Sequence, residues 1–196
     1  MMTARIRSLL SVPLACLLAL ALPGAADARV RNVTDPDAPR SLPIDGRVEV
    51  RWTDPAQFSD IRHSGNRWQA SRGNWVMQLA EHLRESAGKR LPAGTQLEVE
   101  ITDVRRAGMY EPWHGIRLQD VRILRDHYPP RMDLRFRLLG ANGTVLAQGE
   151  RELVDGAFLM RSTSLGDSDP LRYEKAMIDR WLRDEFGRDA HVAATP

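Results

Sequence analysis

The clearest structural signal in this chain is a β-hairpin between residues 132 and 153. From 132 to 138, apolar and charged side chains alternate strictly, as expected of a strand with one buried and one exposed face. Asn142-Gly143 follows, the strongest short hairpin turn, because both residues tolerate positive φ. The chain then returns through Val145 to Leu153. It must therefore contain antiparallel sheet with an apolar face to be covered.

Two more segments alternate in the same way, and a third does so briefly. Residues 48–52 place valines and a tryptophan between charged residues, and 97–101 place Leu, Val and Ile between glutamates. Val121 and Ile123 indicate a short additional strand. These patterns predict three strands besides the hairpin.

Two segments carry the apolar stripe of an amphipathic helix. In the first, apolar residues recur at helical spacing from Trp75 to Ala87; Ser71 is a candidate N-cap, and Gly88 a candidate end. The second is predicted to begin with Asp169 as N-cap and Pro170 at its first position. Its stripe consists of Leu171, Met177, Ile178, Trp181, Leu182 and Phe186.

The simplest fold for these elements is a two-layer α+β sandwich, with both helices packed on one face of a mainly antiparallel sheet. We expect one domain over residues 47–187. The other sheet face then carries charges that either form a solvated lattice of ion pairs or bind a partner of mixed charge. These are Glu98, Glu100, Arg135, Arg137, Glu150 and Glu152.

Residues 1–28 are typical of a cleaved Sec-type signal peptide. A basic head precedes an apolar run, Leu9 to Leu22, which is too short to span a bilayer, and Ala26-Asp27-Ala28 matches the small-x-small cleavage pattern. We expect cleavage near Ala28, an extended leader over 29–46, a flexible tail over 188–196, and a periplasmic or secreted protein. The mature chain has no integral membrane segment in this interpretation.

Composition narrows the partners and the chemistry. The only cysteine is Cys16, inside the apolar run, so the mature chain would lack thiol ligands and disulfides. Just two of the 28 basic residues are lysines, a bias that suggests a GC-rich bacterial genome. Because 26 acidic residues nearly balance the basic ones, nucleic acid is not expected as a partner.

Three segments together resemble an exported bacterial family known as domain of unknown function 3016. They are Leu97-Glu-Val-Glu-Ile-Thr-Asp-Val104, Asp126-His-Tyr-Pro-Pro-Arg-Met-Asp-Leu134, and Asp169-Pro-Leu-Arg-Tyr-Glu-Lys175 with the following Trp181 and Phe186. The resemblance covers roughly residues 48–186. It implies an exported single-domain bacterial protein and brings no activity.

The most distinctive loop runs from Gly108 to Gly115. It offers Tyr110, Glu111, Trp113 and His114 as candidate partner-binding residues. Alternatively, Trp113 could fold back as a lid on the core, or Glu111 and His114 could ligate a metal. Pro112 and the two glycines are expected to keep this backbone out of a strand.

Other catalytic signals are weak. Asp126 and His127, as neighbours on an extended segment, would point to opposite sides. The serines lack a nucleophile elbow, and phosphate-loop and dinucleotide motifs are absent from the sequence. We expect a non-enzymatic binding module that uses neither metal nor cofactor and binds an envelope protein, peptide or saccharide. The alternative is a small periplasmic hydrolase that uses the Glu111/His114 region or Asp126.

Overall fold

The computed structural model describes residues 32–160 and 168–187, which form an α+β fold. The main sheet consists of β1 (Val48–Trp52), β2 (Gln96–Arg105), β5 (Arg131–Leu139) and β6 (Val145–Val154). A small second sheet pairs β3 (Met109–Tyr110) with β4 (Arg122–Ile123). The helices are α1 (Ser59–Arg62), α2 (Arg67–Ser71), α3 (Trp75–Gly88) and α4 (Arg172–Phe186), with 3₁₀ turns at Pro55–Gln57 and Pro112–His114.

The main sheet is mixed, with strand order β1-β2-β5-β6. The β2–β5 and β5–β6 pairs are antiparallel, as predicted, whereas β1 runs parallel to β2. The parallel pairing of β1 with β2 follows from the way the chain connects these two strands. The chain between β1 and β2 includes α3, and such a crossover brings the second strand back in the direction of the first.

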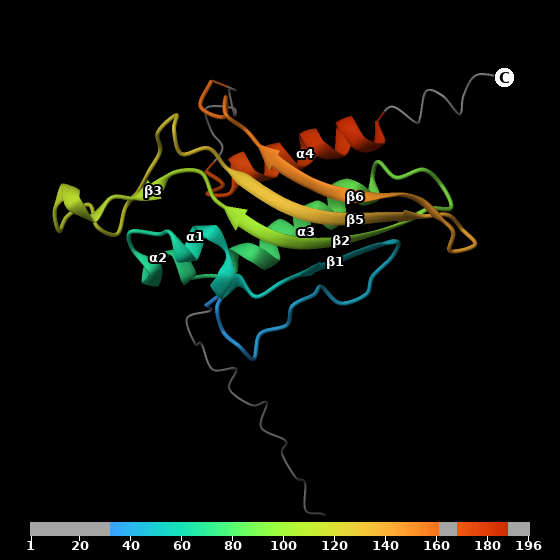
Figure 1. Cartoon of the computed structure of the whole chain (residues 1–196), viewed down its shortest axis with the longest axis horizontal. Helices are drawn as coiled ribbons and strands as arrows, with labels where there is room; N and C mark the ends of the chain where they lie inside the picture. Colours follow the sequence, from blue (N-terminus) through green and yellow to red (C-terminus); the bar gives the residue numbers. More distant parts are fainter. Residues whose placement is uncertain (1–31, 161–167, 188–196) are drawn as a thin grey trace, which may run out of the picture.

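Both long helices lie on the same side of the sheet (Figure 1), and the core lies between. Alternate residues of β1, β2 and β5 are buried, as the sequence pattern predicted. On α4, Trp181 and Phe186 pack with Phe136 of β5, with ring centroids 5.8–6.0 Å apart in T-shaped arrangements. Aromatic pairs of this geometry stabilise beyond the area they bury.

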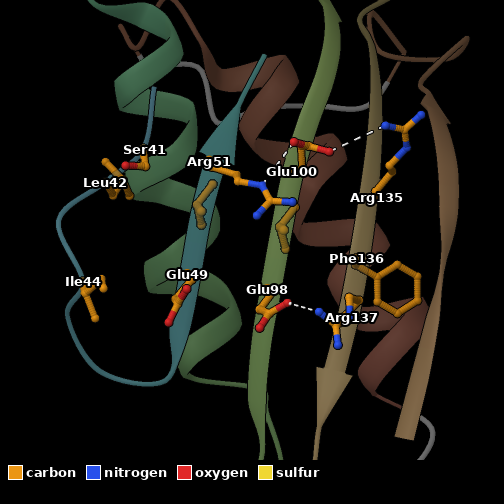
Figure 2. A pocket seen from close by; sticks show the side chains of 12 residues that line it. Ser41, Leu42, Ile44, Glu49, Arg51, Glu98, Glu100, Arg135, Phe136 and Arg137 are labelled. Atoms are coloured by element: carbon orange, nitrogen blue, oxygen red, sulfur yellow. Dashed lines mark hydrogen bonds and ion pairs between the residues drawn. The ribbon is translucent and has the colours of Figure 1, made fainter. Parts of the chain in front are cut away.

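The predicted hairpin is present as β5 and β6. Gly140 N–H donates to the Thr144 carbonyl over 2.8 Å, and Gly143 takes φ of +78°, the left-handed region for which glycine is suited. The open sheet face also matches its prediction. Arg135 lies between Glu100 and Glu150, at 3.6 and 2.8 Å, and Arg137 pairs with Glu98 at 3.0 Å, as Figure 2 shows in part.

Two predicted helix starts are wrong. Ser71 is the last residue of α2 and does not cap α3. Helix α3 begins at Trp75, after a bend in which Gly73 has φ of +88°. Asp169 likewise lies outside α4: its carboxylate accepts from Leu171 N–H over 2.8 Å and closes a turn before the helix begins at Arg172. In both cases the residue predicted as the N-cap belongs to local structure that precedes the helix. Ser71 belongs to α2, and Asp169 to a turn closed by its own side chain.

The segment before β1 lies against the outer edge of that strand. Leu42 N–H donates to the Val50 carbonyl over 3.0 Å, and Trp52 N–H donates to the Arg40 carbonyl over 2.8 Å. Thus part of the expected extended leader covers a sheet edge that would otherwise expose unpaired backbone groups. The expected signal peptide and C-terminal tail lie outside the described residues. Within them, no helix is long and apolar enough to cross a membrane.

Candidate interaction site on the β3–β4 arm

Residues 108–128 form an arm that reaches past the end of the main sheet, beside α1 and α2 (Figure 1). At its base Met109 pairs with Ile123, and Tyr110 pairs with Arg122. The prediction that this backbone stays out of a strand is therefore wrong for Met109 and Tyr110. The ladder is only two residues long, because Pro112, which has no N–H to donate, comes two residues after Tyr110 in the chain.

A buried ion cluster attaches the arm to the body of the protein. Asp60 on α1 is 5% exposed and accepts four hydrogen bonds of 2.9–3.0 Å: two from Arg106, after β2, and two from Arg122 on β4. The Arg106 guanidinium also lies 4.3 Å from the Trp75 ring, and that of Arg122 lies 4.8 Å from the Tyr110 ring. These contacts fix the arm relative to α1 and α3.

The electrostatics of this cluster favour the charged form of Asp60. Burial alone would raise the pKa of its carboxyl, but Arg106 and Arg122 outweigh that effect and hold the pKa below its ordinary value. Gly65 adds a close contact beneath the arm, since a Cβ there would collide with the Tyr110 carbonyl oxygen. The base of the arm is consequently both charged and tightly packed.

Glu111 anchors the next part of the arm from inside. It is 2% exposed and receives two hydrogen bonds from Arg125, at 3.0 and 2.7 Å, and one from the Tyr128 hydroxyl at 2.9 Å. His114 Nε2 lies 3.0 Å from its second oxygen. The hydrogen bonds from Arg125 lower the pKa of Glu111 to about 2, exceeding the opposite effect of burial. This carboxylate is thus a weak base, and Arg125 and Tyr128 occupy both its oxygens.

Residues 112–121, the arm tip, carry large apolar side chains in solvent. Trp113 is 64% exposed and Ile116 84%, with Leu118 and Val121 at 40% and 47%. The alternative in which Trp113 covers the core is wrong, because this side chain is mostly exposed and is not part of the hydrophobic core. Clusters of exposed apolar residues of this kind mark interaction sites in soluble proteins.

Helix α2 supports the arm tip from one side. Asn66, its N-cap, donates to the Gln119 carbonyl over 3.1 Å and to the Asp120 carboxylate over 2.9 Å. Two residues further on, Trp68 is 62% exposed, with the Arg72 guanidinium 4.5 Å from its ring. A second exposed tryptophan therefore lies on the element that holds the arm tip.

The structure separates the four predicted contact residues into two pairs. Tyr110 and Glu111 are buried in the arm, whereas Trp113 and His114 are exposed or half-exposed at its tip. The prediction that Asp126 and His127 point to opposite sides is wrong. The chain turns there and brings Asp126 Oδ1 to 3.0 Å from His127 Nδ1. Among residues 32–160 and 168–187, no three His, Cys, Asp or Glu side chains converge as metal ligands.

A buried carboxyl that sequence reasoning missed lies on α4. Glu174 is 1% exposed; Ala107 N–H donates to its Oε1 over 2.6 Å, while Oε2 has no hydrogen-bond partner among the described residues. Burial raises the pKa of this carboxyl above its ordinary value. A signal was available, because Glu174 lies three residues after Leu171 and four before Ile178, on the apolar stripe of the helix.

Comparison with known proteins gives a family but no activity. The model of a protein family of unknown function, DUF3016, matches residues 46–184. The chain belongs to this family. A solved structure of a "putative lipoprotein" from Caulobacter crescentus is 15% identical, covers 76% of this chain and 93% of its own, and superposes with a TM-score of 0.34. No curated protein matches the sequence.

Proposed function

We propose that this DUF3016 protein is a non-enzymatic binding module of the bacterial envelope that contacts its partner through the arm tip. The observation that carries the proposal is the contrast in solvent exposure between the base and the tip of the arm. Charged residues at the base of the arm are buried and fully engaged, whereas the apolar side chains at the tip are exposed. A rigid support that presents apolar anchors is the usual arrangement of an interaction site.

The four predicted contact residues take different parts in this proposal. Trp113 and His114 would meet the partner, and Tyr110 and Glu111 would hold the arm in position. Glu111 supports this division through its three hydrogen bonds from Arg125 and Tyr128. An arm held in one conformation loses little conformational entropy on binding, which favours affinity.

The hydrolase alternative gains little from the same geometry. A general base should have a pKa near the working pH, and Glu111 is far below it. A cavity of about 470 Å³ lies on the open face of the main sheet, but most of the charged side chains that line it pair with one another, such as Glu98 with Arg137 (Figure 2). Such mutual pairing is typical of a solvated surface lattice.

Localisation and domain organisation are part of the proposal. Residues 1–28 would be removed during export, and residues 47–187 would form the single domain in the periplasm. N-terminal sequencing of the protein purified from the periplasm should give a start at or near Arg29. An uncleaved chain recovered from the membrane fraction would contradict this.

Site-specific photo-crosslinking in living cells tests the contact site. A photoreactive amino acid at position 113 should give an adduct, whereas the same group at position 44 should not. Ile44 is a matched control, since it is 82% exposed but lies on the segment before β1, away from the arm. Equal adducts at both positions, or the absence of both protein and lipid adducts at 113, would show that the arm tip is not the contact site.

A further inference from the structure

We propose that the arm tip docks on the surface of an anionic phospholipid bilayer, an inference that rests on the proposed function of the tip as the contact site. The side chains at its end have the composition of a membrane-interface segment. Between Pro112 and Leu118 the exposed apolar groups are Trp113, Ile116 and Leu118, and the ionisable residues are His114 and Arg117. Tryptophan and aliphatic residues flanked by arginine suit the boundary between headgroups and acyl chains.

Part of the backbone of the arm tip is already hydrogen-bonded within the arm. The amides of His114, Gly115, Leu118 and Val121 each donate to a carbonyl three residues earlier, over 3.0–3.2 Å. Unpaired backbone amides are expensive to remove from water, so these successive turns lower the cost of entering the lipid interface.

The charges around the arm tip favour an anionic surface. Exposed Arg62 and Arg67 lie on α1 and α2, and Arg72 follows directly, next to Trp68. Nearby acids are partly engaged: Asn66 donates to Asp120, and Asp126 contacts His127. Glu111, the acid next to the tip, is buried against Arg125. These exposed arginines, on and next to the helices beside the arm, add positive charge that favours an anionic surface over a neutral one.

Vesicle flotation with the protein exported under its own leader and purified from the periplasm tests this directly. The protein should float with vesicles of phosphatidylglycerol and phosphatidylcholine, and much less with phosphatidylcholine alone or at high salt. Trp113→Ser and Ile116→Ser should each reduce the partition coefficient about tenfold, the expected effect of losing one buried apolar side chain. Arg117→Gln should reduce it about fivefold on anionic vesicles only.

The matched control is Ile44→Ser, which removes an equally exposed isoleucine outside the arm and should bind vesicles as the wild type does. Equal binding by the Ile116→Ser and Ile44→Ser variants, or no binding to anionic vesicles, would overturn the bilayer proposal. The crosslinking experiment then separates the two ideas. A protein adduct at position 113 without vesicle binding leaves the proposed function standing, whereas the absence of both results overturns the two together.

Discussion

Replacing Asp60 by asparagine should destabilise the protein severely, because two buried guanidinium groups would lose their counterion. The side chains of Arg106 and Arg122 are only 13% and 18% exposed, so water cannot substitute for the carboxylate. The new amide would also direct its own N–H groups at these donors. Breaking a buried pair in this way typically costs about 3–5 kcal/mol. With a urea dependence of about 2 kcal/mol per molar, the unfolding midpoint should fall by roughly 2 M.

The matched control is Glu150→Gln, which breaks an ion pair of similar length in a solvated setting. Glu150 lies 2.8 Å from Arg135, and their side chains are 75% and 59% exposed. Exposed pairs contribute about 0–1 kcal/mol, so this midpoint should move by about 0.5 M or less. Urea unfolding followed by circular dichroism measures both variants. Equal midpoint shifts for Asp60→Asn and Glu150→Gln would refute the idea that the Asp60 cluster fixes the arm.

Three further predictions concern the core, the arm and pH. Trp181→Ala should cost about 3–5 kcal/mol and Trp113→Ala less than about 1.5 kcal/mol, measured by the same unfolding assay, since the first ring is 5% exposed and the second 64%. Gly65→Ala should destabilise by about 1–3 kcal/mol through its collision with the arm, whereas Gly88→Ala, with no neighbour within 4 Å, should not. The raised pKa of Glu174 means that the folded state binds more protons than the unfolded chain, so the contribution of this carboxyl to stability falls as pH rises above about 4.5. The Glu174→Gln variant should therefore be more stable than the wild type at pH 7 and lose that advantage at pH 4. An advantage that does not depend on pH would contradict this.

Local patterns in the sequence predicted the strands and the long helices well, because the spacing of apolar residues along the chain indicates which face of an element is buried. The alternation from Met132 to Leu138 gave β5, and the stripe containing Trp181 gave the buried face of α4. Periodicity does not report which neighbour a strand pairs with. For that reason the parallel arrangement of β1 and β2 was missed, although the helical segment between them pointed to a crossover.

The candidate site was only partly predictable, for a related reason. The loop with Trp113 stood out by its composition, but the partners that determine its environment are distant in sequence. Asp60 meets Arg122 only in the folded state, and Glu111 meets Arg125 across the arm. From the sequence alone, Asp60 was one of many acidic residues in a connection, and Glu111 was a candidate partner contact, metal ligand or catalyst rather than an anchor.

The parallel pairing of β1 with β2 has a consequence for the order in which the molecule can assemble. Any chain leaves a ribosome or a translocation channel N-terminus first, so β1 emerges long before β2, with residues 53–95 between them. The β5–β6 hairpin closes through a short turn, whereas β1 must wait for a distant partner. Trp181 and Phe186, which pack on Phe136, arrive after all of the strands. The part of the sheet that α4 covers therefore keeps its apolar face exposed until synthesis is nearly finished, whereas β1 can already pack against α3.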